Sequence, residues 1–227
     1  MALRFSEKLA MVKLQSAFFE YFGPKGMEVA KLLADEFKKN NCLTMLDAKK
    51  SDISSSCFAY GKAYLGEGSY YKFDAMTLVP YFGFKEHLDL FDYARENNAI
   101  LFLMVRSSTP NSQLIDLANN NGRTIYKTIA AEISDYNQAN NGSFIGAVVG
   151  ATIENYRETL EFLPNSLILS PGIGFQGGNI EELIKNRDIL GKRIIPTLSR
   201  DIWNAGPDIE KIAARLDYYQ QLSAQLF

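Results

Sequence analysis

Short apolar runs that alternate with longer amphipathic stretches constrain the fold of this chain more than any other feature of its sequence. Seven such runs occur, at residues 9–15, 44–49, 75–81, 99–105, 145–151, 166–172 and 193–200. Their length and their valine, isoleucine and leucine content are typical of buried parallel strands. The stretches between them place apolar residues at helical spacing. In residues 25–39, for example, Ala30, Leu33, Ala34 and Phe37 fall on one face.

Strands that alternate with helices indicate βαβ units and therefore an α/β fold. A doubly wound open sheet and a closed (β/α)₈ barrel both agree with this pattern. No linker rich in Pro, Gly or Ser and no change of composition divides the chain. We therefore predict a single domain that covers residues 1–227.

Composition excludes several classes of protein. The formal charge is −2, which disfavours a nucleic-acid protein that works by neutralising phosphates. The longest apolar run, residues 99–105, is too short to span a bilayer. Two cysteines and one histidine exclude a Cys/His zinc cluster, and they fit a protein of the reducing cytoplasm. The histidine, His87, lies in a helical stretch and is expected at the surface.

Charged side chains occupy positions where the pattern predicts strands or their ends. Lys13 lies within the first apolar run, and Asp47, Lys49 and Asp52 lie at the end of the second. Functional groups of parallel α/β folds collect at the C-terminal ends of strands. Asp47 and Lys49 are two residues apart, so a regular strand directs both to one face, where a buried charge needs a partner. A structural ion-pair network is the alternative to a catalytic site here.

A glycine-rich loop and an arginine near the C-terminus point to an anion. The loop SPGIGFQGG (170–178) follows an apolar run and precedes a helix, so its backbone amides are able to converge on a negative ligand. Arg200 follows one βα unit later and is suited to clamp a phosphate through two hydrogen bonds. If the fold is a TIM barrel, the loops after its last two strands typically form the phosphate site. The alternative for the glycine-rich loop is a tight strand-to-helix turn, and the alternative for Arg200 is an ordinary ion pair at the surface.

Together these motifs resemble a known family. LDAKKSDI resembles the D-x-K-x-x-D signature of orotidine 5′-phosphate decarboxylase, and MVKLQSAFFEYFG resembles the segment that carries the family's other active-site lysine. VRSSTP, VVGAT, SPGIGFQGG and SRDI follow in the family's order. The resemblance extends from about residue 9 to about residue 206. It implies a TIM (β/α)₈ barrel, a homodimer, no cofactor or metal, and conversion of orotidine 5′-phosphate to UMP and CO₂ in pyrimidine biosynthesis.

The resemblance also implies roles for the charged residues. Lys13, Asp47, Lys49 and Asp52 would form an alternating tetrad whose members keep one another ionised, with Asp52 supplied by the partner subunit. Asp47 would repel the substrate carboxylate, and Lys49 would stabilise and protonate the carbanion at C6.

For substrate binding, the resemblance assigns Ser108 to the pyrimidine and Gln176 to the region between base and phosphate. Arg200 and the amides of Gly177 and Gly178 would hold the phosphate.

One departure from the family concerns the first strand, which in the family reads roughly apolar-G-x-D-P. Only MALRFSEK (1–8) precedes the lysine run, so seven strands are clear where a barrel has eight. The sequence could begin downstream of that strand, or residues 1–8 could fill part of the gap. The third interpretation is a paralogue that binds the nucleotide without turning it over. A milder departure is Leu14, where the resembling branch has proline.

A second enzyme class is a Mg²⁺-dependent sugar-phosphate lyase of the same barrel group, in which Asp47 and a neighbouring acid would hold the metal. The next strand run, AMTLVPY (75–81), contains no carboxylate, which counts against this class.

Overall fold

The computed structural model describes residues 5–227 and contains seven strands in a hydrogen-bonded sheet of order β1-β2-β3-β4-β7-β8-β9. They are β1 (Met11–Gln15), β2 (Leu43–Lys50), β3 (Ala75–Leu78), β4 (Ile100–Arg106), β7 (Ile145–Val149), β8 (Ile168–Ser170) and β9 (Ile194–Pro196). Every pair of these strands with a described register is parallel. The predicted α/β class and all seven predicted strands are confirmed, with shorter bounds at most ends.

The segment before β1 forms no strand in its described part. Residues Ser6–Lys8 form a short 3₁₀ helix, η2, and Phe5 is buried. The interpretation that residues 1–8 fill part of a first strand also falls on residues 1–4, which lie outside the described residues. Within residues 5–227, β1 therefore pairs only with β2.

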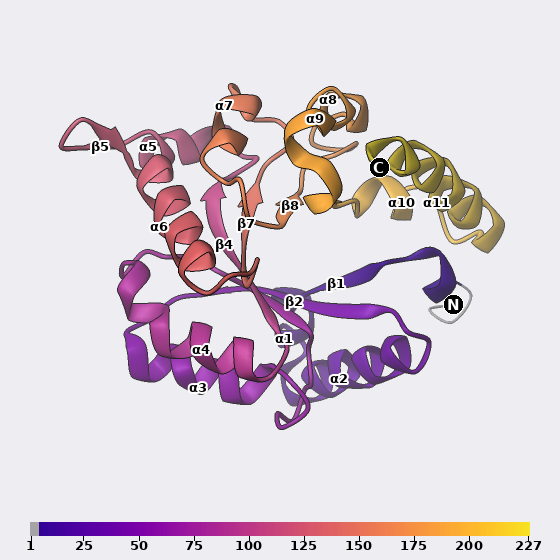
Figure 1. Ribbon diagram of the computed structural model, residues 1–227. Coiled ribbons are helices and arrows are strands. Elements are labelled where there is room, and N and C mark those ends of the chain that lie inside the picture. The colour runs from indigo at the N-terminus through magenta and orange to yellow at the C-terminus, as the bar shows by residue number, and fades with distance from the viewer. Residues whose placement is uncertain (1–4) are drawn as a thin grey trace. The chain divides into compact units, whose positions relative to one another are not determined.

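Contacts divide the chain into two compact units, which meet in sequence within β4, at Leu103 and Met104. The helices of the first unit are α1 (Ser16–Glu20), α2 (Gly23–Lys39), α3 (Ser54–Tyr64), η3 (Phe84–His87) and α4 (Leu88–Glu96). Helices α2, α3 and α4 cover one face of its strands (Figure 1). Of the four residues that the helical spacing placed on one face of α2, Ala30, Ala34 and Phe37 are buried and Leu33 is half-buried.

The second unit holds the remaining helices and a two-stranded hairpin. They are η4 (Pro110–Ser112), α5 (Gln113–Asp116), the hairpin β5 (Asn119–Asn120) and β6 (Arg123–Thr124), α6 (Ile125–Ala139), α7 (Tyr156–Glu161), α8 (Ile180–Ile184), α9 (Arg187–Leu190), η5 (Gly191–Arg193), α10 (Arg200–Trp203), α11 (Ile209–Ser223) and η6 (Ala224–Leu226). Helix α6 packs beside β7, and α10 contacts α11. No helix in the described part of the chain is long and apolar enough to cross a membrane.

Candidate active site

Asp47 lies at the centre of a cluster of charges in the first unit. Lys13 Nζ donates to Asp47 Oδ2 at 2.5 Å, and Lys49 Nζ donates to Asp47 Oδ1 at 2.6 Å. Lys13 comes from β1, whereas Asp47 and Lys49 come from the end of β2. Three of the predicted residues therefore meet, and two cations hold one carboxylate whose side chain is only 8% exposed.

The end of β2 is not a regular strand. The pairing of β2 with β3 shifts between Leu46, opposite Met76, and Lys50, opposite Leu78. Residues 47–49 of β2 thus face the single residue Thr77 of β3. Such a bulge redirects side chains and often lies beside a functional site. The alternation of a regular strand predicts that Asp47 and Lys49 share a face. In the structure the two side chains do meet, but across an irregular backbone.

Lys49 takes an unusual backbone conformation inside the bulge. Its φ is 48°, in the left-handed region that residues other than glycine rarely adopt. A conformation of this kind persists only where surrounding interactions hold it. Its amide donates to Thr77 Oγ1 at 3.0 Å, and its Nζ is held by Asp47.

The two lysines determine the ionisation of Asp47. Burial by itself raises the pKa of this carboxyl, but the charge and hydrogen bond of Lys13, followed by those of Lys49, outweigh burial and lower the pKa. Asp47 is consequently a carboxylate at neutral pH, in a place where water screens its charge poorly. A second carboxylate brought next to it would be strongly repelled unless it lost its charge.

Thr77 contacts this cluster and was missed by the sequence reasoning. Its hydroxyl is buried and donates to Asp47 Oδ1 at 2.8 Å. The available signal was a lone polar residue within the apolar run AMTLV (75–79). Threonine is also a good strand former, so the signal was weak.

Asp52 lies apart from the three residues above. Its carboxylate accepts a hydrogen bond from the amide of Ile53 at 2.8 Å. Within residues 5–227 it forms no ion pair with Lys13 or Lys49. The next helix, α3, is fixed to a neighbouring segment through Ser54, whose amide donates to Glu86 and whose hydroxyl donates to Asp89.

A second group of predicted residues belongs to the glycine-rich loop of the second unit. Gly172, Gly174 and Gly177 have φ values of 100°, 76° and 90°, which explains the need for glycine. The amide of Gly178 donates to Gly172 O at 2.9 Å, and that of Gly177 donates to Gly174 O at 2.8 Å. The two amides that were predicted to bind an anion are therefore engaged within the loop.

Ser108 and Gln176 lie within hydrogen-bond distance of each other. Ser108 Oγ donates to Gln176 Oε1 at 3.3 Å. Thr152 Oγ1 donates to the carbonyl of Ser108 at 2.9 Å, so the backbone of the Ser108 segment is also held from the β7 side. A Cβ at Gly150 would lie 2.5 Å from the amide nitrogen of Ser108, so only glycine fits beneath this segment.

Arg200 begins α10, and its guanidinium lies 3.9 Å from the centre of the Phe175 ring. Stacking of this kind orients the flat cation and leaves its N–H edges available. Within the described residues Arg200 forms no ion pair. The adjacent Asp201 accepts hydrogen bonds from Arg215 Nε at 2.8 Å and from Tyr219 OH at 2.6 Å, which fixes α10 to α11.

The prediction that His87 lies at the surface is wrong. The ring is fully buried, stacks on Phe91 and hydrogen-bonds through Nδ1 to Gly83 O at 2.9 Å. His87 shares its helical face with Leu90, Phe91 and Ala94, all of them buried. Burial lowers the pKa of His87. His87 therefore belongs to the core of the first unit.

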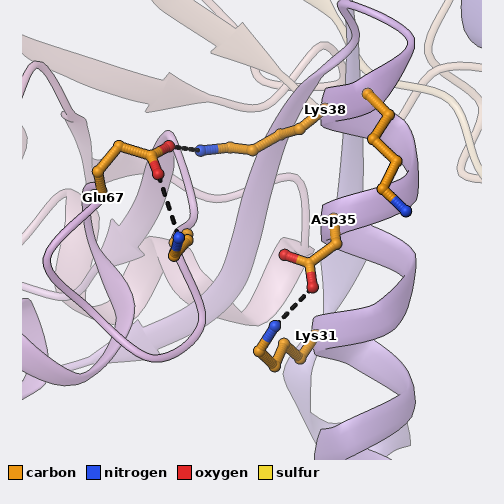
Figure 2. A pocket seen from close by; sticks show the side chains of 6 residues that line it. Lys31, Asp35, Lys38 and Glu67 are labelled. Atoms are coloured by element: carbon orange, nitrogen blue, oxygen red, sulfur yellow. Dashed lines mark hydrogen bonds and ion pairs between the residues drawn. The ribbon is translucent and has the colours of Figure 1, made fainter.

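An open hollow beside α2 contains none of the predicted residues. Six charged side chains line it: Lys31, Asp35, Lys38, Lys39, Glu67 and Lys72. Figure 2 shows that Lys31 pairs with Asp35 and that Lys38 pairs with Glu67. Because these charges already satisfy one another, the hollow is not a candidate active site. Nor do the described residues contain a group of three or more His, Cys, Asp or Glu side chains arranged to hold a metal ion.

Comparison with known proteins gives one consistent result. The model of the family described as "Orotidine 5'-phosphate decarboxylase / HUMPS family" matches residues 1–215. The orotidine 5′-phosphate decarboxylase of Myxococcus xanthus is 38% identical over 216 residues, which cover 92% of this chain and 74% of that protein. The protein of the same name from Streptomyces coelicolor is 32% identical, with 94% of this chain and 77% of that protein covered.

Solved structures agree with the sequence comparison. A crystal structure from Streptomyces avermitilis, provisionally named orotidine 5′-phosphate decarboxylase, has a TM-score of 0.85 and 30% identity, and the match covers 98% of this chain and 82% of that one. The orotidine 5′-monophosphate decarboxylase of Plasmodium berghei has a TM-score of 0.74 and 25% identity, with 94% of this chain and 66% of that chain covered.

Proposed function

Because this chain belongs to the orotidine 5′-phosphate decarboxylase / HUMPS family, we propose that it decarboxylates orotidine 5′-phosphate to UMP and CO₂ in pyrimidine biosynthesis. The observation that carries the proposal is the buried Asp47 carboxylate held between Lys13 and Lys49. Decarboxylation needs a group that destabilises the substrate carboxylate and a group that stabilises the resulting carbanion. An aspartate with a lowered pKa and an adjacent ammonium meet both needs.

In the proposed reaction Asp47 faces the carboxylate of the substrate. Repulsion between the two negative groups is relieved as CO₂ leaves, so it favours the transition state over the bound substrate. The C–C bond breaks with its electron pair left on C6. Lys49 stabilises this carbanion with its positive charge and then transfers a proton to it, which gives UMP. Lys13 keeps Asp47 ionised and in place.

We propose that the second unit binds the phosphate and the pyrimidine. The free N–H edges of Arg200 support a phosphate-binding role for this side chain. Ser108 would contact the pyrimidine, and Gln176 would reach between base and phosphate. The amides of Gly177 and Gly178 donate within the loop, so their proposed binding to the phosphate requires that these hydrogen bonds be shared with it or released to it.

We propose a homodimer in which each Asp52 completes the charged tetrad of the other subunit, and the lack of a bond from Asp52 to Lys13 or Lys49 within the described residues of this chain agrees with that arrangement. A cytoplasmic location is supported by two buried free thiols, Cys42 and Cys57. The sugar-phosphate lyase is not favoured, because residues 75–81 carry no acid for a metal.

The test mixes the protein with orotidine 5′-phosphate and follows the loss of ultraviolet absorbance as UMP forms. Lys49→Ala should abolish turnover and leave UMP binding largely intact, because the ammonium acts on the carbanion and not on the product. Lys50→Ala is the matched control, since the neighbouring Lys50 pairs with Glu20 at 3.4 Å instead of with Asp47.

Absence of turnover by the wild-type protein, with UMP still bound, would contradict the proposal and favour a non-catalytic nucleotide-binding protein. Turnover of a sugar phosphate that stops when a chelator removes Mg²⁺ would instead favour the lyase. Equal loss of turnover and of UMP binding in Lys49→Ala would contradict the role given to Lys49.

A further inference from the structure

Thr77 occupies a singular place in the sheet. It is the one residue of β3 opposite residues 47–49 of β2, where the regular ladder of backbone hydrogen bonds is interrupted. Its side chain replaces part of that ladder, because Thr77 Oγ1 accepts from the amide of Lys49 at 3.0 Å. The same oxygen donates its proton to Asp47 Oδ1 at 2.8 Å.

The hydroxyl of Thr77 is thereby used in both directions. A hydroxyl has one proton to donate and lone pairs to accept with, and here the proton goes to a carboxylate while a lone pair takes an amide. Thr77 is 1% exposed, so water does not compete for either bond. A carboxylate accepts strongly and a rigid strand fixes the hydroxyl, so both partners of Thr77 are held in one geometry.

We propose that Thr77 is a positioning residue, which sets the orientation of the Asp47 carboxylate and holds the backbone of Lys49 in its left-handed conformation. The inference rests on the proposed decarboxylation and adds to it a residue that does not touch the substrate. Among residues 5–227, Oδ2 is held by Lys13, whereas Oδ1 is held by Lys49 and Thr77 together. Without the hydroxyl, Lys49 and Asp47 constrain only each other at this oxygen.

The decisive variant is Thr77→Val, which has nearly the same shape but no hydroxyl. We expect kcat to fall about 10- to 100-fold, because small errors in the placement of reacting groups are costly. UMP affinity should change less than about twofold, since the effect is confined to the reaction step. Thr77→Ser keeps the hydroxyl and should recover most of the lost rate.

Thr44→Val is the matched control. Thr44 is likewise a buried threonine, and its hydroxyl donates to the Asp74 carboxylate at 2.8 Å, but it lies at the other end of β2. Its loss should leave kcat near the wild-type value. Melting temperatures of all variants show whether each is folded at the assay temperature.

Three kinetic results would overturn the inference: a wild-type kcat in Thr77→Val, a folded Thr77→Ser that is as slow as Thr77→Val, or an equal loss of rate in Thr44→Val. The crystal structure of Thr77→Val gives a readout that does not depend on activity. The proposal requires that Lys49 leaves the left-handed region or that Asp47 rotates, and unchanged positions of both would refute it. If the wild-type protein fails to turn over orotidine 5′-phosphate, the proposed function is wrong. The crystal structure of Thr77→Val then decides by itself whether Thr77 positions Asp47 and Lys49.

Discussion

Replacement of Lys13 by methionine tests whether Lys13 stabilises a buried charge. Lys13→Met keeps most of the apolar stem and removes the ammonium that lies 2.5 Å from Asp47 Oδ2. Removing one partner of a buried ion pair costs about 3–5 kcal/mol when the other charge is left alone. Asp47 retains Lys49 and Thr77, so the loss should be close to that of one hydrogen bond to a charged group, about 2 kcal/mol.

The measurement is urea unfolding at pH 7. With a slope of about 2 kcal/mol per molar urea, the midpoint should fall by about 1 M. Lys31→Met is the control. Lys31 forms an ion pair of the same length with Asp35, and its side chain has the same 20% exposure as that of Lys13. Asp35 is more exposed than Asp47, so this variant should change stability far less.

The pH dependence of the stability difference between the wild type and Lys13→Met identifies the cause of that difference. Folding lowers the pKa of Asp47, so the stabilisation by its ion pairs is fully present above the unfolded pKa and is lost as pH falls through the folded pKa. The stability gap between wild type and Lys13→Met should therefore be widest at neutral pH and should narrow as the pH is lowered through about 4. A gap that stays constant from pH 7 down to about pH 2.5, well below the ordinary range of a carboxyl pKa, would refute an electrostatic origin and indicate a packing effect.

Two further predictions follow from the second unit and from the core of the first. Arg200→Ala should weaken UMP binding about 10- to 100-fold, which corresponds to the loss of one or two charge-assisted hydrogen bonds, and Phe175→Ala should weaken it less because only the orientation of the arginine is lost. Calorimetric titration with UMP measures both dissociation constants. An unchanged Kd for Arg200→Ala would show that this residue does not bind the phosphate. For His87, whose pKa is lowered by burial, the unfolded chain takes up a proton first as pH falls below 6.5, so the wild type should lose up to about 1 kcal/mol of stability between pH 6.5 and pH 5.5. His87→Gln should lack this loss, and parallel pH profiles of the two proteins in urea unfolding would contradict the assignment.

The sequence was informative where periodicity alone determines the structure. All seven apolar runs form strands, because a short run of aliphatic residues between amphipathic stretches has few other ways to be buried. His87 could have been placed correctly by the same rule. It stands three, four and seven residues before Leu90, Phe91 and Ala94, which is the spacing of a buried helical face. The error came from treating a single histidine as polar before considering its position.

Local irregularity of the backbone could not be predicted from the sequence. The bulge at residues 47–49 leaves no mark in LDAKK, since neither alanine nor lysine signals a left-handed conformation. The role of Thr77 depends on that bulge and could not be inferred without it. The loop at 170–178 was recognised from its glycines, but the engagement of the Gly177 and Gly178 amides follows from how the loop closes on itself. In both places the conformation depends on which backbone groups pair in three dimensions, and the amino-acid composition does not determine that pairing.

The left-handed backbone of Lys49 reverses the usual order of residue preference at one position of a strand. In an ordinary strand, valine is favoured and glycine and asparagine are disfavoured. At a φ of 48° the steric penalty falls hardest on β-branched side chains and spares glycine and asparagine. Among chains that lack the ammonium at position 49, the stability ranking should therefore run opposite to the strand scale. Designs that improve this protein by filling its strands with β-branched residues would fail at the position that carries the proposed proton donor.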